Sequence, residues 1–510
     1  MDDFTYLYTS EQIKSAERCI ASDNGFPLFD LMVKAGRAVF DLACLTYPDK
    51  KHWLVVCGKG NNGGDGYIVA TLALQAGITA TVYEMAGCEH NQGDAFKARQ
   101  GFLAAGGMPK TMQDGNELAN DKQVSFDLVF DALLGTGLKG ELRAECINVI
   151  HEINKRSLAV IAIDVPSGLN ADTGKVEGDK GNPIAVIARH TISFIGVKTG
   201  LVTGQARHHV GRLHLARLGI SEQDLTHYQE PACRADLCAN AAKWMSPRAA
   251  TAHKGTAGKL LVVGGGAGML GATRLATNAA LRAGAGLVKA CVDEASLSPL
   301  QAAEREVMAA SWQVAKPNLA WCDVVVLGPG LGQSSLAHSI CEFAISQRDK
   351  PMVVDADGLN YLAQYSQFKS TDRRDNWILT PHPGEAARLL HCSVSHIESD
   401  RYAAIKAIQQ RYGGAVVLKG AGTLIFDGQT CYVCTRGNAG MATGGMGDVL
   451  SGVIGSYLAQ GYTPTQAALL GVLVHSMAAD NGVKESGMIG LLASELLPEI
   501  RRLTNYFAQR

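Results

Sequence analysis

Short apolar runs alternate with amphipathic stretches through the first half of the chain. Each apolar run predicts a buried strand, and each stretch between two runs predicts a helix of about 10–15 residues. The strands are apolar at consecutive positions, which indicates a parallel sheet that is covered on both faces. The expected strands are 53–57, 79–83, 127–130 and 159–163, and the expected helices are 65–76 and 94–105.

The same alternation restarts in the second half, after a polar stretch at 221–241 that contains Pro231. We therefore place a domain boundary at residue 225, which gives a first domain of residues 1–225 and a second of residues 226–510. Each domain is expected to be an α/β fold with three αβα layers. The expected strands of the second half are 259–263, 287–291, 323–327, 352–354, 377–379, 415–418, 423–426 and 430–433, with helices at 272–283 and after Gly447.

Composition and charge exclude several classes of protein. Hydrophobic residues make up 47% of the 510 residues, which is enough to offset chain entropy, so a disordered chain is not expected. The formal net charge is −1 and no basic run occurs, which argues against a nucleic-acid partner. The start of the chain lacks signal-peptide features, and the apolar run 467–474 is too short to span a membrane. Thirteen cysteines without regular spacing suit a reducing cytoplasm.

Two glycine-rich loops match the GxGxxG pattern of dinucleotide-binding folds. Gly58–Gly63 lies between a predicted strand and a predicted helix, and Glu84 follows about twenty residues later, as that pattern requires. Gly266–Gly271 fits equally well, with Asp293 at the corresponding distance. Because the chain contains 57 glycines, a structural turn explains each match as well as a cofactor site does.

Three loops of the first half carry polar side chains where strands are predicted to end. The loops are 61–66, 131–140 and 164–168. Ligands of parallel sheets bind beyond the carboxyl ends of the strands, so the loops are expected to form one site. The side chains that would meet there are Asp65, Asp131, Asp164 and Ser167. Helix capping is the competing explanation for any single aspartate.

The second half also follows predicted strands with glycine-rich loops, at 327–332, 380–385 and 419–423. His382 stands between two prolines that could direct it at a ligand, although an exposed loop histidine is the plainer interpretation.

The most informative segment is 437–448, where Gly444–Gly447 precede a predicted helix and could offer amide groups and the helix dipole to an anion. Asp448 beside them suits a base that takes a proton from an attacking hydroxyl, with a helix cap as the alternative. No Walker A pattern occurs, which excludes a P-loop NTPase.

With these motifs the chain resembles a known enzyme family. The loops 61–66, 131–137 and 164–168 are similar to those of the NAD(P)H-hydrate epimerase family, which implies a Rossmann-like αβα domain. The second half is similar to the NAD(P)H-hydrate dehydratase family, which implies a ribokinase-like αβα domain. This second resemblance is carried by 253–255, 328–332, 380–385, 419–423 and 438–448. The whole chain thus resembles the bifunctional NAD(P)H-hydrate repair enzymes, although Thr256, Ala257 and Arg305 depart from the family's commoner pattern.

The resemblance implies roles for individual residues. In the first half, the hydrated cofactor would be bound by Asn61, Asn62, Gly63, Gly64, Asp65, Gly135, Thr136, Gly137, Leu138, Lys139, Gly140, Glu141 and Asp164. A potassium ion would be held by Asn62, Asp131 and Ser167. In the second half, the hydrated cofactor would be faced by Ala272, Gly332, His382 and Asp448. ADP would be held by Lys419, Gly420, Ala421, Gly422, Thr423, Asn438, Thr443, Gly444, Gly445, Met446 and Gly447.

The implied activity is repair of hydrated NADH and NADPH, abbreviated NADHX and NADPHX. Asp164 would move a proton while the R and S epimers interconvert, and Asp448 would deprotonate the C6 hydroxyl of the S epimer during ADP-dependent dehydration. The implied cofactors are K⁺ and ADP, and Mg²⁺ can accompany ADP. A homo-oligomer in the cytoplasm is expected, with no nucleic-acid or membrane partner.

Three other functions are compatible with parts of the sequence. A ribokinase-like small-molecule kinase would use the same Asp448 loop, with the first half as a non-catalytic domain. A nicotinamide oxidoreductase would use both GxGxxG matches but would leave 443–448 unexplained. A non-catalytic scaffold would have no need of Asp164 and Asp448.

Overall fold

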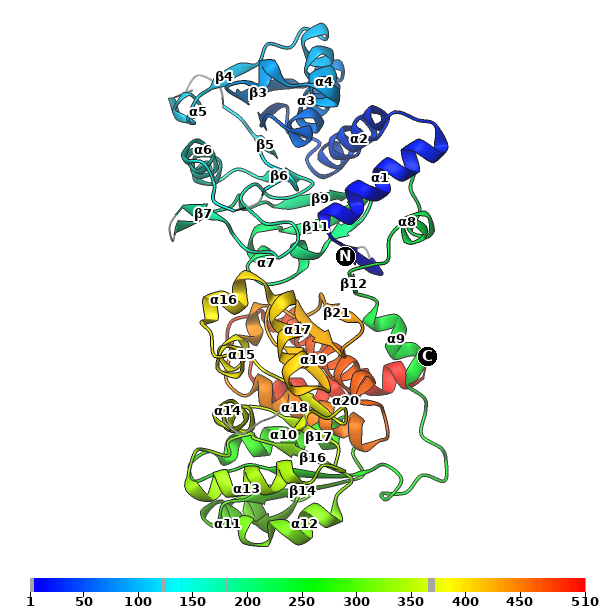
Figure 1. Cartoon of the computed structure of the whole chain (residues 1–510), viewed down its shortest axis with the longest axis vertical. Helices are drawn as coiled ribbons and strands as arrows, with labels where there is room; N and C mark the ends of the chain where they lie inside the picture. Colours follow the sequence, from blue (N-terminus) through cyan, green and yellow to red (C-terminus); the bar gives the residue numbers. More distant parts are fainter. Residues whose placement is uncertain (1–3, 121–124, 139, 180–181, 366–371, 510) are drawn as a thin grey trace. The chain divides into compact units, whose positions relative to one another are not determined.

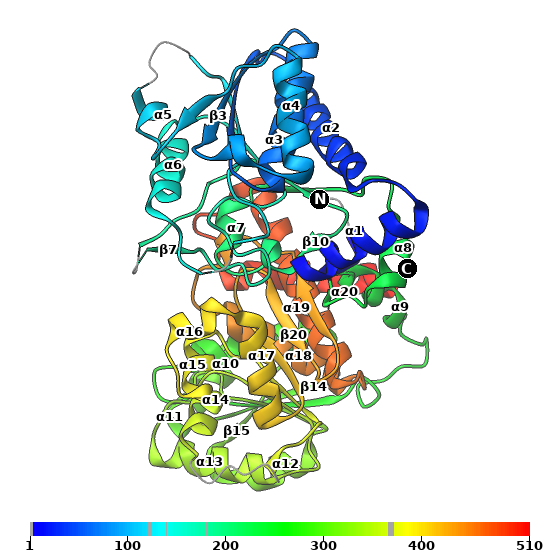
Figure 2. The same ribbon diagram turned by 45° about the horizontal axis from the view of Figure 1, so that its top comes forward.

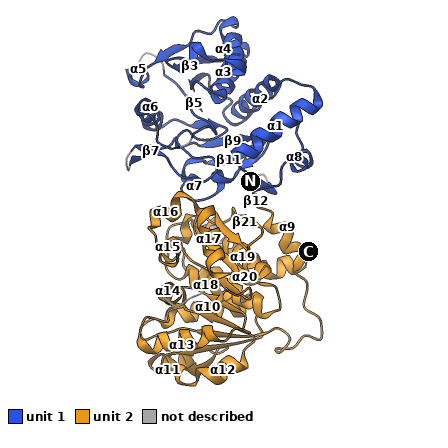
Figure 3. Ribbon diagram, viewed as in Figure 1, with its two compact units in different colours: residues 1–233 blue, residues 234–510 orange. Residues whose placement is uncertain are grey.

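The computed structural model describes residues 4–120, 125–138, 140–179, 182–365 and 372–509. The chain divides into two compact units, residues 1–233 (the first unit) and 234–510 (the second unit), shown in separate colours in Figure 3. Among the described residues, no helix is both long enough and apolar enough to cross a membrane.

The first unit is built on a parallel sheet with the strand order β11-β9-β6-β5-β2-β3-β4. Its strands are β2 (His52–Cys57), β3 (Thr79–Met85), β4 (Lys110–Met112), β5 (Leu128–Ala132), β6 (Val160–Ile163), β9 (His190–Phe194) and β11 (Arg212–Ala216). Successive strands run outward from β2 in one direction and from β5 in the other. The strand order therefore reverses between β2 and β5, which is where open α/β sheets bind ligands.

Helices cover both faces of this sheet, as the consecutively apolar strands predict. Val55 and Phe130 belong to a core with residues of α1 to α4, whereas the adjacent Val56 and Val129 belong to a core with residues of α5 and α6. In Figures 1 and 2, α2, α3 and α4 lie together on one side of β3, and α5 and α6 on the other. The helices are α1 (Ser10–Asn24), α2 (Leu28–Thr46), α3 (Asn61–Gln75), α4 (Gly93–Ala104), α5 (Asn116–Asn120), α6 (Ala144–Lys155), α7 (Ala206–His209) and α8 (Glu222–Tyr228). Outside this sheet, the short strands β1 (Tyr6–Tyr8) and β10 (Val197–Lys198) pair with each other in parallel, and β7 (Gly178–Asp179) pairs with β8 (Asn182–Pro183).

The second unit has the strand order β21-β20-β19-β18-β17-β16-β13-β14-β15, with β20 and β21 antiparallel to their neighbours. Its strand order reverses between β13 and β16, by the same rule as in the first unit. The strands are β13 (Lys259–Val263), β14 (Leu287–Val292), β15 (Met308–Ser311), β16 (Val324–Leu327), β17 (Met352–Val354), β18 (Trp377–Leu379), β19 (Ala415–Leu418), β20 (Thr423–Phe426) and β21 (Cys431–Cys434). Arg234 of β12 (Cys233–Arg234) pairs in parallel with Tyr432.

A large apolar core joins one face of this second sheet to α9, α10, α18, α19 and α20. The close approach of α10 and α18 depends on Gly452, because a Cβ there would lie 2.0 Å from the carbonyl oxygen of Ala276. The helices of this unit are α9 (Leu237–Trp244), α10 (Leu270–Arg282), α11 (Glu294–Ala303), α12 (Ala315–Trp321), α13 (Ser335–Ser346), α14 (Asp357–Gln364), α15 (Pro383–Leu390), α16 (Val394–Ser399), α17 (Arg401–Tyr412), α18 (Met446–Ala459), α19 (Pro464–Ser486) and α20 (Leu496–Ala508).

Three predicted boundaries are wrong in a way that affects the site. Helix α3 begins at Asn61 instead of residue 65, so the glycines expected in a loop form its first turns. Helix α18 begins at Met446, whereas it was expected to begin after Gly447, so Gly447 and Asp448 both lie in its first turn. Strand β5 continues through Asp131, which was expected to follow the strand. In the two helices the backbone continues through glycines, since packing outweighs their low helix propensity.

Candidate functional site

The first site lies at the reversal point between β2 and β5. Gly58 directly follows β2 and packs against the loop after β5. A Cβ on Gly58 would lie 1.8 Å from the carbonyl oxygen of Leu133 in that loop. A Cβ on Gly63 would lie 2.0 Å from the carbonyl oxygen of Gly58. These glycines are therefore required by backbone packing that brings the N-terminus of α3 against the loop after β5.

A cavity of about 860 Å³ opens at this point, and all the residues that line it belong to the first unit. Of the residues expected to bind the hydrated cofactor, the cavity is lined by Asn61, Asn62, Asp65, Gly135, Thr136, Gly137, Leu138, Glu141 and Asp164. Gly63, Gly64 and Gly140 are not among its lining residues. Lys139 lies outside the described residues. The converging loops thus meet at one cavity of a size suited to a small-molecule ligand.

Asp164 has an unusual backbone conformation, and its side chain is paired with a buried lysine. Its φ of 63° lies in the left-handed region, which non-glycine residues rarely adopt. Its carboxylate forms an ion pair with Lys198 and accepts the backbone N–H of Phe194 at 3.2 Å. Lys198 is only 2% exposed and also donates to the Ser193 hydroxyl at 3.3 Å and to the Phe194 carbonyl at 3.2 Å. Sequence motifs did not indicate Lys198, because its partner lies 34 residues away.

Two further carboxyl groups share the cavity with this ion pair. Burial raises the pKa of Asp65 well above its ordinary value, and the charges of Asp164 and Glu17 raise it further. Burial also raises the pKa of Glu17, against the opposing effect of Lys198. A cavity that holds several carboxyl groups with perturbed pKa values is typical of a site that transfers protons.

Asn62, which lines this cavity, belongs to a polar cluster with the buried Asp131 and Ser167, to which it is connected through the Leu134 backbone. Asp131 is fully buried and accepts the Ser167 hydroxyl at 2.5 Å and its backbone N–H at 2.7 Å. Asn62 is 8% exposed and donates its amide to the Leu134 carbonyl at 2.9 Å. Its Oδ1 has no hydrogen-bond partner among the described residues. Burial raises the pKa of Asp131 to about 6.

The acids that follow the two GxGxxG matches are not placed to contact a ribose, although Gly58, Gly60 and Asn62 of the first match line the cavity. Glu84, which would contact a ribose, is 1% exposed and instead accepts the Tyr67 hydroxyl at 2.5 Å and two Arg99 guanidinium bonds at 2.8 Å. Asp293 caps α11 by accepting the backbone N–H of Ala295 at 2.9 Å. Because both acids are used within the protein, the two matches give no support to an oxidoreductase.

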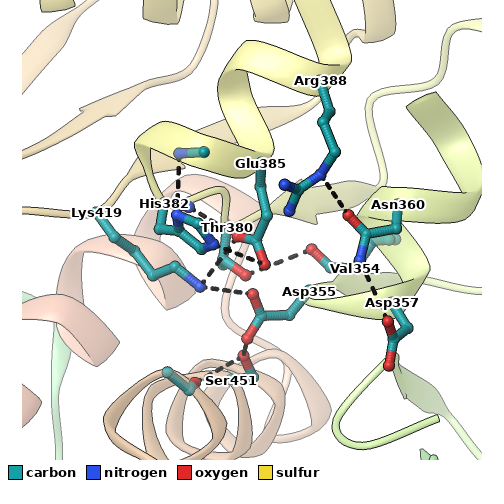
Figure 4. Close-up of polar contacts among 12 residues, drawn as sticks. Val354, Asp355, Asp357, Asn360, Thr380, His382, Glu385, Arg388, Lys419 and Ser451 are labelled. Carbon is teal, nitrogen blue, oxygen red and sulfur yellow. Dashed lines mark hydrogen bonds and ion pairs between the residues drawn. The ribbon is translucent and has the colours of Figure 1, made fainter. Parts of the chain in front are cut away.

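The second site lies beyond the carboxyl ends of β17, β18 and β19. Lys419 Nζ lies 2.7 Å from Asp355 Oδ1 and 3.6 Å from Glu385 Oε2, and Asp355 Oδ2 accepts the Ser451 hydroxyl at 2.5 Å (Figure 4). Burial by itself would lower the pKa of Lys419, but Asp355 and Glu385 raise it above its ordinary value. Asp355 directly follows a predicted strand, the same signal that singled out Asp164, and could have been found in that way.

The first turn of α18 brings Asp448 and a set of glycine amides to this network. Gly445, with φ 90°, is the N-cap and forms no side-chain cap bond, so Asp448 is not the helix cap. Burial raises the pKa of Asp448 to about 7, with Asp355 adding to the increase. A Cβ on Gly447 would lie 3.3 Å from Lys419 Nζ, which shows that the helix start adjoins the lysine. An anion at this N-terminus would meet both the amides and the ammonium group.

His382 is the N-cap of α15, a role that its loop position did not predict. Its Nδ1 accepts the backbone N–H of Gly384 at 3.0 Å, and its Nε2 lies 3.6 Å from Glu385 Oε1. Burial lowers the pKa of His382, and Lys419 lowers it further, so the ring is neutral at pH 7. Half of the side chain remains exposed. His382 is thus both a structural cap and a side chain that a ligand can contact.

The remaining predicted residues of the second half are positioned largely by contacts within the protein. The Gly332 N–H donates to Asp357 Oδ2 at 2.8 Å, and Asp357 Oδ1 accepts from Asn360 at 3.2 Å. Ala272 lies in α10, where its Cβ would be 3.0 Å from a Cβ on Gly330. These contacts fix the backbone after β16 and leave the chemistry to the side chains beyond β17 to β19.

Two charged residues that the sequence motifs missed, the buried Arg401 and the partly buried Asp480, support the expected nucleotide loops. Arg401 is 1% exposed and donates to the carbonyl oxygens of Leu418 and Lys419, at 3.2 and 3.1 Å, which fixes the start of the 419–423 loop. Asp480 of α19 accepts the Gly437 N–H and the Asn438 amide, both at 3.0 Å. Neither residue adjoins its loop in the sequence.

Comparison with known proteins matches both units. A family model described as NAD(P)H-hydrate dehydratase matches residues 260–502, and one described as YjeF-related protein N-terminus matches residues 28–200. The bifunctional NAD(P)H-hydrate repair enzyme Nnr of Vibrio cholerae is 45% identical over 504 residues, or 98% of each chain. The enzyme of that name from Escherichia coli is 42% identical over 503 residues, which cover 98% of this chain and 94% of its own. The ADP/ATP-dependent NAD(P)H-hydrate dehydratase of Bacillus subtilis, co-crystallised with ATP and Mg²⁺, is 28% identical and covers 53% of this chain and 97% of its own, with a TM-score of 0.48.

Proposed function

The chain belongs to the family of bifunctional NAD(P)H-hydrate repair enzymes, and on that premise we propose that its two units divide the repair between them. As a member of this family it is both an epimerase and a dehydratase of hydrated NAD(P)H. The first unit, residues 1–233, is the epimerase, and the second, residues 234–510, is the ADP-dependent dehydratase. The proposal is supported above all by Asp448, a carboxyl group with a pKa of about 7 beside Lys419 and the amides of α18.

In the dehydratase, the reaction joins phosphoryl transfer to elimination. Asp448 takes the proton of the C6 hydroxyl as the hydroxyl oxygen attacks the β-phosphorus of ADP, and AMP leaves. The amides of Gly444–Gly447 and the Lys419 ammonium group stabilise the phosphate charge. The ring nitrogen then expels phosphate, and loss of a C5 proton restores the dihydronicotinamide. Mg²⁺ bound with ADP would add to this charge stabilisation.

The residues at the base of the first cavity suit potassium. Asn62 has a buried, unpartnered carbonyl oxygen, and Asp131 is a buried carboxyl group without a cationic partner among the described residues. These two groups and the Ser167 hydroxyl offer hard oxygen ligands with one formal charge, as a monovalent ion prefers. When bound, K⁺ would neutralise Asp131 and fix the loop that contacts the cofactor.

The direct test is to incubate the full chain with separated R and S epimers of NADHX, with and without ADP. We expect the S epimer to regain the dihydronicotinamide absorbance only with ADP, and the R epimer to convert to S without it. If the chain is divided after residue 233, the first fragment should retain only R-to-S conversion and the second only ADP-dependent dehydration. Both activities in a single fragment would contradict the division between the units.

A further inference from the structure

Helix α1 is held near Lys198 by strand pairing. Strand β1 directly precedes α1 and pairs in parallel with β10, the strand that contains Lys198. The backbone N–H and hydroxyl of Ser10 donate to Asp172 Oδ1 at 2.6 and 2.8 Å, which anchors the start of the helix. Ile13 packs so closely on Gly196 that a Cβ there would lie 2.7 Å from Ile13 Cδ1. The inner face of α1 is therefore fixed relative to Lys198.

Glu17 lies one helical turn after Ile13, on the same face of α1. It is half-buried and lines the 860 Å³ cavity together with Asp65, Asp164 and Lys198. No sequence motif indicated Glu17, and the family model that matches the first unit begins at residue 28, after this helix.

We propose that Glu17 is a second catalytic acid–base residue of the epimerase. Glu17 donates a proton to the substrate, and Asp164 accepts a proton from it. This inference rests on the epimerase function proposed above. It assigns the N-terminal helix, which packs over the sheet, a direct part in the chemistry.

Epimerisation at C6 needs both a proton acceptor and a proton donor. Asp164 takes the proton of the C6 hydroxyl, the C6–N1 bond breaks with its electron pair passing to N1, and Glu17 delivers a proton to N1. The opened ring carries an aldehyde at C6. Rotation about the C5–C6 bond presents the other face of the aldehyde, and ring closure reverses both proton transfers. The cycle consumes neither residue and requires no other reactant.

Asp65 is the other carboxyl group that could donate this proton. It is buried in the first turns of α3, and burial raises its pKa well above the ordinary value. Burial also raises the pKa of Glu17, but the Glu17 side chain is only half-buried. A donor must regain its proton in every cycle, which favours the carboxyl group that solvent can reach. Lys14 and Arg18, which flank Glu17 on α1, moderate the increase. Asp65 is thus better suited to hydrogen bonding than to proton transfer.

The test is the R-to-S conversion of NADHX by the full chain without ADP, followed by chromatography of the epimers. We expect Glu17→Gln to lower kcat by about 10²–10⁴, the usual contribution of a general acid, with KM changed only a few-fold. The pH profile of kcat should lose its alkaline limb. Glu11→Gln is the matched control, because Glu11 lies exposed on the same helix and should leave the rate unchanged.

A Glu17→Gln rate close to that of the unaltered chain would overturn the role of Glu17. If Glu17→Gln lowers the unfolding temperature, Glu17→Asp decides instead. Activity that is partly recovered with aspartate supports proton donation, and activity as low as with glutamine contradicts it. Failure of the unaltered chain to interconvert the epimers would contradict the proposed function itself, which separates the two ideas.

Discussion

Both units place an aspartate–lysine pair beyond the carboxyl ends of a parallel sheet, but the lysines are held differently. The Lys198 ammonium group uses all three of its hydrogen-bond donors within the protein, to Asp164, Ser193 and a backbone carbonyl, and is in this sense saturated. Lys419 is shared between Asp355 and Glu385 and adjoins the amides at the start of α18.

The difference follows from where each site lies on its sheet. In the first unit the reversal point between β2 and β5 opens into the cavity. In the second unit, the loops at the corresponding point are joined by backbone hydrogen bonds from Gly265 to Pro329 at 3.2 Å and from Gly266 to Gly330 at 2.7 Å. The charged side chains gather instead beyond β17 to β19. A saturated lysine orients a proton-transferring carboxylate, whereas a shared lysine can turn to an incoming phosphate.

The largest expected effect that separates the sites is that of Asp448→Asn. The change removes the base but keeps the size of the side chain, so dehydration of S-NADHX should fall by about 10²–10⁴. Nucleotide binding should persist, because the amides of α18 are untouched, and R-to-S conversion should not change. Asp349→Asn, at an exposed position of the same unit, is the control. Dehydration at close to the original rate would remove Asp448 from the mechanism.

Replacing each lysine separately with methionine tests the role of its ion pair in each unit. Lys419→Met leaves the buried Asp355 carboxylate without its ion pair, which costs about 3–5 kcal/mol of stability, and Lys198→Met leaves the partly buried Asp164 without its ion pair. We expect Lys198→Met to impair R-to-S conversion alone and Lys419→Met to impair dehydration and nucleotide affinity alone. Calorimetric titration with ADP and separate assays of the epimers distinguish these outcomes. Loss of both activities from one substitution would show that the sites are coupled.

Withdrawal of potassium should affect only the first unit. Replacing K⁺ with a bulky organic cation leaves the Asn62 Oδ1 without a partner and Asp131 without a counter-ion. We therefore expect R-to-S conversion to fall by about tenfold or more, since a single unpaired buried group costs roughly 1–3 kcal/mol. The dehydration of S-NADHX with ADP serves as the internal control. Equal epimerisation rates in both cations would favour an ordinary hydrogen-bonded turn over an ion site.

The smallest expected effects are those of pH, and their signs differ between the units. Asp448 must be ionised to act as a base, so the rate of dehydration should rise with pH through about 7 and then level off.

Asp131 has a pKa raised to about 6, so its contribution to stability is full below pH 4 and is lost as the pH rises through about 6. Potassium should restore that stability above pH 6, because it binds the ionised carboxylate. Hydrogen exchange of peptides from β5 at several potassium concentrations measures this effect.

Local pattern was sufficient to predict most of the strands. The expected strands at 352–354, 377–379 and 415–418 agree with β17, β18 and β19, because a buried parallel strand is a short, continuously apolar run. The loops that follow these strands could also be predicted, since they must lie at one edge of the sheet. For the same reason, Asp65 and Asp164 were expected together, and they line one cavity.

The tertiary structure decided which polar residues serve the sites and which serve the fold. Glu84 and Asp293 follow glycine loops at the spacing expected of ligand contacts. In the structure, Glu84 accepts hydrogen bonds from Arg99, and Asp293 caps the N-terminus of α11. Lys198 and Glu17 have no local signature, because Lys198 pairs with Asp164 across 34 residues and Glu17 is placed at the cavity by the pairing of β1 with β10. A local pattern specifies what one segment buries, but the partner of a buried charge is chosen by long-range packing. The sequence by itself therefore determined the two α/β folds and their loop edges, and only the tertiary structure determined the charge networks within them.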